Sequence, residues 1–301
     1  MKVTVSGASG LIGRRLLKTL AAEGHAVDAL SRHAGTNMPR DVKVWPWDPS
    51  SGLPPEGALR EADALIHLAG EPVAQRWTAE ARRHIRESRV AGTRNLVEAI
   101  AKLERRPAVL VSSSAIGYYG SRGDETLTED SAPGSDFLAE VCAAWEREAV
   151  AAEALGVRVV RVRTGVVLDA RGGALARMLP PFRFGLGGRL GNGRQWMSWI
   201  HAADLAALMA FALSHPVSGA MNGVAPEPVR NAEFTRALAG ALRRPAIFPV
   251  PPFALRLAFG EMAGMLLASQ RVAPQTAERA GYSFRFRELQ PALEDALQYN
   301  R

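Results

Sequence analysis

The sequence predicts an α/β fold in which a doubly wound parallel sheet carries a smaller, mostly C-terminal lobe. Residues 3–5 are largely apolar and indicate a short buried strand, and apolar residues then recur at helical spacing over residues 11–20. Between this strand and this helix stand Gly7, Gly10 and Gly13, in the pattern G-x-x-G-x-x-G. Further apolar runs alternate with helical stretches along the chain, which is the order of a parallel sheet covered by helices on both faces.

The glycine pattern indicates a Rossmann-type turn that binds the pyrophosphate of a dinucleotide. Glycine permits a tight turn, lets the backbone approach the pyrophosphate, and lets the helix pack closely on the sheet. The N-terminus of the helix presents unpaired N–H groups to the anion. The alternative is an ordinary glycine turn, but the position between an apolar strand and an amphipathic helix favours nucleotide binding. The residues of this turn that we expect to contact the cofactor are Gly7, Ser9, Gly10, Leu11, Ile12 and Gly13.

The end of the second predicted strand, over residues 26–30, favours NADP over NAD. In this fold an acidic residue at that place accepts a hydrogen bond from the ribose 2′-hydroxyl of NAD. Ser31 and Arg32 stand there instead, and Asp28 lies too early, inside the strand. A hydroxyl followed by a guanidinium suits the 2′-phosphate of NADP. The alternative is that Arg32 is a solvated surface residue.

A third predicted strand covers residues 42–48, and a fourth, buried strand begins at residue 64. His67 in the fourth strand fits a core histidine better than a catalyst. The helix predicted over residues 78–100 carries Arg89, which either reaches the cofactor phosphates or is solvated. Small side chains at the end of the fourth strand would let the adenosine side of the cofactor lie against backbone, so we expect contacts from Leu68, Ala69 and Gly70.

The fifth predicted strand, residues 108–111, runs into a segment rich in serine and tyrosine. Ligands of an open parallel sheet bind beyond the carboxyl ends of its strands, so this segment is placed for chemistry. The alternative is a serine-rich turn with aromatic packing. The catalytic candidates are Ser114, Tyr118 and Tyr119.

Composition narrows the class of protein. The formal net charge is +7, but the basic residues are scattered and are mostly arginine, so we expect a small polar or anionic ligand and no nucleic acid. The single cysteine, Cys142, excludes an internal disulfide and a cysteine-built metal site, and it fits the cytoplasm. No apolar run reaches the length of a membrane span, so we expect no signal peptide and no membrane partner. We further expect a monomer or homodimer.

These motifs resemble the extended short-chain dehydrogenase/reductase superfamily, which contains nucleotide-sugar epimerases and dehydratases, and in particular its atypical epimerase-like branch. The resemblance implies an NADP-dependent oxidoreductase or epimerase acting on a small polar substrate, with nucleotide sugars as candidates. It also implies that Ser114 holds a substrate oxygen and that Ser112, Arg163 and Thr164 contact the cofactor. The segments that carry the resemblance are residues 7–13, 67–70, 112–120, 145–146, 163–168, 181–188 and 199–204.

One feature of the superfamily is missing. Most members place a tyrosine and, four residues later on a helix, a lysine that lowers the proton affinity of that tyrosine. In the helix predicted over residues 136–146 no such pair occurs, and no lysine follows Lys102 anywhere in the chain. Either a substitute acid serves, or the protein binds NADP(H) without turnover, as a sensor or regulatory protein. The candidate substitutes are Ser114, Tyr118, Tyr119, Cys142 and Glu146.

The second half of the chain is assigned mainly to the substrate lobe. We expect residues 1–165 to form the NADP-binding domain, with 195–222 returning to it, and residues 166–194 and 223–301 to form the lobe. The glycine-rich stretch 185–193, flanked by arginines, either wraps an anionic substrate or acts as a lid or connector. No histidine cluster supports a metal site.

Overall fold

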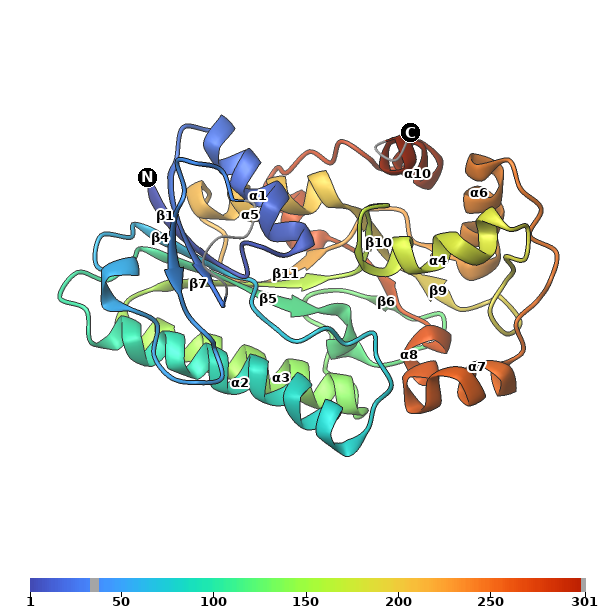
Figure 1. The fold of residues 1–301 in the computed structure, drawn as a ribbon, viewed down its shortest axis with the longest axis horizontal. Helices are drawn as coiled ribbons and strands as arrows, with labels where there is room; N and C mark the ends of the chain where they lie inside the picture. Colours follow the sequence, from blue (N-terminus) through green and yellow to red (C-terminus); the bar gives the residue numbers. More distant parts are fainter. Residues whose placement is uncertain (33–37, 299–301) are drawn as a thin grey trace.

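The computed structural model describes residues 1–32 and 38–298 (Figure 1). Its centre is a seven-stranded parallel sheet with the order β3-β2-β1-β4-β5-β7-β11, which confirms the predicted doubly wound fold. The strand order reverses between β1 and β4, and ligands of such sheets bind at that reversal. The strands are β1 (Lys2–Ser6), β2 (Ala26–Ser31), β3 (Lys43–Pro46), β4 (Ala64–His67), β5 (Val109–Ala115), β7 (Arg158–Thr164) and β11 (Gly219–Gly223).

Helices cover both faces of the sheet (Figure 1). On one face α1 (Leu11–Ala22) packs beside α5 (Ala202–Ser214), and on the other α2 (Ala79–Ala101) packs beside α3 (Phe137–Val150). Side chains alternate between the faces because successive residues of a strand point in opposite directions. Within β4, Ile66 belongs to the core under α1 and α5, whereas Leu65 belongs to the core under α2 and α3.

The lobe has a core of its own, built around residues such as Trp199, Phe234 and Phe286. Its larger helices are α4 (Gly173–Arg183), α6 (Asn231–Leu242), α7 (Pro252–Phe259) and α10 (Leu289–Gln298). The shorter elements of the second half are β8 (Val166–Leu168), β9 (Trp196–Met197), β10 (Trp199–His201), β12 (Val229–Arg230), α8 (Ala263–Leu267), β13 (Arg271–Val272) and α9 (Gln275–Arg279). Short pieces elsewhere are β6 (Thr126–Leu127) and the 3₁₀ helices η1 (Glu56–Ala58), η2 (Ile116–Tyr119), η3 (Ala151–Leu155) and η4 (Gly260–Met262).

The segment 195–222 contributes elements both to the domain of the large sheet and to the lobe. Its α5 packs on the large sheet and β11, which ends one residue later, joins that sheet, whereas β9 pairs with β12 and β10 pairs with β8. The expected domain boundaries therefore stay a prediction. None of the described helices is long and apolar enough to cross a membrane.

Helix α1 can lie this close to the turn that precedes it only because residue 13 has no side chain. A Cβ at Gly13 would lie 2.6 Å from the Cα of Ala8 and would press on the carbonyl oxygen of Gly7. We expect Gly13→Ala to lower the free energy of unfolding by about 1–3 kcal/mol, because both neighbours are backbone atoms. The measurement is urea denaturation followed by circular dichroism.

Gly240 provides the matched control, since it also lies inside a helix but a Cβ there would meet nothing within 4 Å. Gly240→Ala should leave stability unchanged or raise it by up to about 1 kcal/mol. Equal stability of the two variants would contradict the close approach of α1 to the turn.

Candidate functional site

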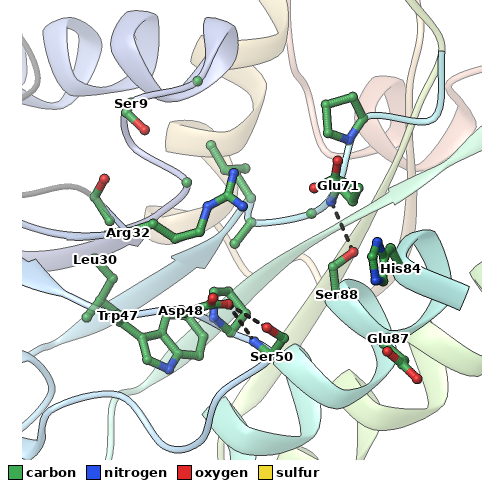
Figure 2. Close-up of a pocket in the computed structure, with 18 of the residues that line it drawn as sticks. Ser9, Leu30, Arg32, Trp47, Asp48, Ser50, Glu71, His84, Glu87 and Ser88 are labelled. Atoms are coloured by element: carbon green, nitrogen blue, oxygen red, sulfur yellow. Dashed lines mark hydrogen bonds between the residues drawn. The ribbon is translucent and has the colours of Figure 1, made fainter. Parts of the chain in front are cut away.

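A cavity of about 670 Å³ opens at the carboxyl ends of β1, β2 and β4 (Figure 2). It lies at the reversal of strand order, where an open sheet of this kind binds its ligand. The predicted cofactor residues that the structure brings together in its lining are Gly7, Ser9, Gly10, Ser31, Arg32, Leu68, Ala69 and Gly70.

The glycine turn forms one wall of this cavity. Gly7 adopts φ +68°, and a Cβ there would lie 2.9 Å from the backbone nitrogen of Ala69. Gly10 is the N-cap residue of α1, and its N–H donates to the carbonyl oxygen of Gly7 at 3.0 Å. The first turn of α1 contains no acidic residue, so its free N–H groups and positive dipole end face the cavity uncompensated. This wall is therefore built to receive an anion.

Arg32 supplies a positive charge on the side of the cavity where β2 ends. Its guanidinium points into the space between the glycine turn and the segment after β3 (Figure 2). Asp28 offers no carboxylate here, because Lys2 (3.5 Å) and the indole nitrogen of Trp45 (3.2 Å) hold its Oδ2 inside the sheet. The end of β2 thus presents a cation, as the sequence predicts.

The opposite wall comes from residues that the sequence analysis did not select. Asp48 follows β3, and its Oδ1 accepts hydrogen bonds from the backbone N–H (2.9 Å) and the hydroxyl (2.7 Å) of Ser50. These bonds, and more weakly the charge of Arg32, lower the pKa of Asp48. The position of Asp48 alone could have indicated it, since it follows the end of a strand at this edge of the sheet. The further lining residues are Trp47, Asp48, Pro49 and Ser50, and from the region of α2 Glu71, Pro72, Arg83, His84, Glu87 and Ser88.

Arg89 does not line the cavity, contrary to one reading of the sequence. Its Nη1 donates to the carbonyl oxygens of Glu71 (2.9 Å) and Ile85 (3.1 Å), and its guanidinium lies against Gly70. Burial lowers its pKa. Arg89 therefore holds the loop after β4 in place from behind the cavity.

Other predicted cofactor residues also lie outside this cavity. Leu11 lines a neighbouring hollow, while Ile12 and Gly13 continue α1 behind the turn. Ser112 is buried on β5, and Thr164 ends β7, where its hydroxyl approaches the carbonyl oxygen of Val162 at 3.4 Å.

His67 is a core histidine, as expected, but its ring is not fully satisfied, because the buried Nε2 has no hydrogen-bond partner among the described residues. The hydroxyl oxygen of Ser6 accepts from the backbone N–H groups of Leu68 (3.2 Å) and Ala69 (3.4 Å). The hydroxyl hydrogen is then free to bond to Nδ1 of His67, which lies 2.6 Å away. Burial lowers the pKa of His67 to about 4, so the ring is neutral and fixes the turn after β1 to the loop after β4.

The hydroxyl of Ser114 is already engaged inside the protein. Ser114 is buried near the end of β5 and donates to Oε1 of Glu146 on α3 at 2.7 Å. Arg163 binds the same carboxylate through two bonds, at 2.8 Å from Nε to Oε1 and 2.9 Å from Nη2 to Oε2. Arg161 adds a third contact at 3.2 Å. Burial alone would lower the pKa of Arg163, but the hydrogen bonds and charge of Glu146 raise it above its ordinary value.

Tyr119 belongs to the same network, which argues against it as a proton partner of a substrate. Its hydroxyl donates to Oδ1 of Asn222 at 2.7 Å and accepts from Nη1 of Arg163 at 3.0 Å. The side chain is fully buried, and burial raises its pKa to about 12. Cys142 is equally unsuited, because burial raises the pKa of its thiol to about 12.

Tyr118 differs from its neighbour. It is only partly buried, and its hydroxyl forms no hydrogen bond within the described part of the chain. The guanidinium of Arg163 lies 3.5 Å from its ring centroid, so the ring is held in place by a cation–π contact. Among the three catalytic candidates, Tyr118 alone has an uncommitted polar hydrogen. The described residues contain no cluster of side chains suited to a metal ion.

A parallel sheet whose glycine turn and basic residue open on a cavity at its carboxyl edge defines a nucleotide-binding protein of the Rossmann class. Within that class, residues 3–225 match the model of the NAD dependent epimerase/dehydratase family, and the chain belongs to this family. Residues 250–296 match a second model, a domain of unknown function termed DUF1731.

Two of three comparisons place the chain within the family. It is 40% identical over 307 residues to epimerase family protein SDR39U1 homolog, chloroplastic, of Arabidopsis thaliana, covering 99% of this chain and 87% of that protein. The crystal structure of human epimerase family protein SDR39U1 (isoform 2) with NADPH superposes with a TM-score of 0.87 at 36% identity, covering 99% of both chains. These two matches confirm the resemblance to the atypical epimerase-like branch.

The third comparison concerns the fold alone. The Thermus thermophilus UDP-glucose 4-epimerase in complex with NAD has a TM-score of 0.80 and covers 99% of both chains, but it is 22% identical.

The buried neutral ring of His67 makes stability depend on pH. In the unfolded chain this ring takes up a proton below its ordinary pKa of 6.5, whereas in the folded protein it does so only near 4. Between these values the unfolded state binds more protons, so the free energy of unfolding decreases as the pH falls. We expect His67 to account for a loss of about 1.5 kcal/mol as the pH falls from 6.5 to about 5.

Urea denaturation at several pH values measures this effect. His67→Asn keeps an acceptor for Ser6 but does not titrate, so the variant should have a shallower pH dependence than the wild type. The same replacement at the exposed His215 controls for the loss of a histidine as such. An unaltered slope in His67→Asn would contradict the assignment.

Proposed function

We propose that this protein binds NADPH, with the adenosine half in the cavity and the 2′-phosphate at Arg32. One observation carries the proposal: the guanidinium of Arg32 points into a cavity walled by the glycine turn, at a strand end where an NAD-binding protein would present a carboxylate. Human SDR39U1, which was solved with NADPH, supports the choice of cofactor.

The residues around the cavity fit the parts of this cofactor. A Cβ at Gly7 would lie 2.9 Å from the backbone nitrogen of Ala69, and one at Gly10 would lie 3.2 Å from the carbonyl oxygen of Gly7, so glycine keeps this turn tight. The free N–H groups at the start of α1 suit a pyrophosphate. The carboxylate of Asp48 is an acceptor suited to the amino group of adenine. The small residues Ala69 and Gly70 let the loop after β4 lie close to the ligand.

The test is a direct titration of the purified protein with NADPH and NADH. The wild type should bind NADPH more tightly, and Arg32→Ala should weaken NADPH binding by roughly tenfold to a hundredfold, since hydrogen bonds to a charged group are worth about 1.5–3 kcal/mol. NADH has no 2′-phosphate, so its affinity serves as the internal control and should hardly change. Equal affinity of the wild type for both nucleotides would refute the role of Arg32.

We further propose that the protein is an NADP-dependent oxidoreductase or epimerase-like enzyme for a small polar or anionic substrate, with nucleotide sugars as candidates. The nicotinamide supplies or accepts a hydride when it is bound. Because Ser114 gives its hydrogen to Glu146, its oxygen can only accept, so it would hold a substrate hydroxyl rather than a carbonyl. Tyr118 would donate or take up the proton.

Arg163 acts in this proposal through its neighbours. It fixes Glu146, which sets the direction of the Ser114 hydrogen bond, and it holds the Tyr118 ring. The proposal also includes a location in the cytoplasm, which the single buried Cys142 suggests. It includes a monomeric or homodimeric state as well.

A second candidate function is an NADP(H)-binding sensor or regulatory protein without turnover. The observation in its favour is that Ser114 and Tyr119 are both engaged inside the protein: Ser114 donates to Glu146, and Arg163 binds both Glu146 and Tyr119. A screen of carbonyls and nucleotide sugars, read out both by NADPH oxidation and by product analysis, distinguishes the two. A reductase would oxidise NADPH and an epimerase would convert a sugar without net loss of cofactor, whereas a sensor would do neither.

If turnover is found, the adjacent tyrosines form a matched pair of variants. Tyr118→Phe should reduce turnover by about a hundredfold or more and leave NADPH binding intact, since it removes the proposed proton donor. Tyr119→Phe should retain most of the turnover but lower stability by about 1–3 kcal/mol, because Oδ1 of Asn222 loses the hydroxyl that donates to it and Nη1 of Arg163 loses one acceptor. The reverse pattern would overturn the assignment of Tyr118.

A further inference from the structure

The outer end of the lobe exposes apolar side chains that the proposed cofactor site does not use. Among the described residues, nine large apolar side chains are exposed, and all but Met1, Leu53 and Phe259 are more than half exposed and fall in two segments. The exposed fractions reach 80% at Phe184 and Leu257. We call this surface the apolar–basic face, and its apolar members are Phe184, Leu186, Ile247, Phe248, Phe253 and Leu257.

The two segments, residues 181–190 and 243–260, lie side by side. The N–H of Val250 donates to the carbonyl oxygen of Arg189 at 2.9 Å, and a bridge joins Leu190 to Val250. Helix α7 follows directly and buries only Leu255 among its residues. The elements that carry the face gather at the end of the molecule away from the N-terminus (Figure 1).

The same two segments are strongly basic. They contain no aspartate or glutamate, and their arginines are all exposed and form no salt bridge within the described residues. The glycine-rich stretch 185–193 was one candidate for wrapping an anionic substrate. Its flanking arginines are exposed instead. The arginines of the two segments are Arg183, Arg189, Arg243, Arg244 and Arg256.

Exposed apolar side chains on segments that also carry exposed arginines match an anionic lipid surface. Apolar side chains enter the interface of a bilayer while arginines bind the headgroups. A second copy of the chain is a poorer occupant, because a two-fold contact would bring both sets of arginines together with no acidic partner.

We propose that the apolar–basic face docks on membrane surfaces rich in anionic lipid. The contact is peripheral, so it requires no membrane-spanning helix. It revises the expectation, drawn from the sequence, that the protein has no membrane partner. The proposal does not depend on NADPH binding or on turnover.

The test is co-sedimentation of the full chain with vesicles made from equal parts of phosphatidylcholine and phosphatidylglycerol. We expect the wild type to bind them, to bind pure phosphatidylcholine vesicles far less, and to detach at high salt. Phe253→Ser combined with Leu257→Ser should weaken binding by about tenfold or more, because it removes the two apolar side chains of α7 that are most exposed. Arg256→Glu should weaken it through charge.

Two variants elsewhere serve as matched controls. Leu53→Ser changes an exposed apolar residue outside the face, and Lys102→Glu reverses a charge at the end of α2; both should bind as the wild type does. Thermal unfolding checks that the α7 variant is folded. Failure of the wild type to bind the mixed vesicles, equal binding to both vesicle types, or equal loss in the controls would overturn the proposal. A dimer that the α7 variant dissociates would assign the face to a second copy instead.

Discussion

The close approach of the turn after β1 to the loop after β4 is the constraint on which the rest of the site depends. Gly7 leaves no room for a Cβ against Ala69, and Gly13 leaves none against Ala8. Ser6 and His67 then join the two segments by a buried hydrogen bond of 2.6 Å. Because of this approach, the N-terminus of α1 and the end of β4 face one cavity, and Arg32 at the end of β2 completes its charge.

A second buried arrangement governs the region where the chemistry is proposed. The usual tyrosine–lysine pair is absent, and an ion pair between Glu146 and Arg163 occupies the space under the ends of β5 and β7. This pair sets the direction of the Ser114 hydrogen bond and encloses Tyr119. Tyr118 lies at the edge of this network, and its hydroxyl forms no hydrogen bond among the described residues. The contacts that make Tyr119 a poor proton donor therefore leave Tyr118 available for that role.

The parts that follow from local sequence rules were predictable. The doubly wound parallel sheet, the glycine turn and the cation at Arg32 each follow from residue type and spacing. The structure contains this sheet and places the turn and Arg32 around one cavity. Side-chain directions were not predictable, because they depend on contacts between distant segments. Arg89 turns behind the loop after β4, and Tyr119 meets Asn222 from a strand more than a hundred residues later. The sequence analysis did not select Asp48, because it belongs to no known motif. Its position just after β3 could have indicated it.

The central claim is that the cavity selects NADPH through Arg32. Native mass spectrometry of the purified protein, incubated with equal concentrations of NADPH and NADH, tests this claim most directly. The account predicts one bound nucleotide per chain, with the mass of NADPH in clear excess. A predominant NADH complex, or no retained nucleotide with either compound, would contradict it.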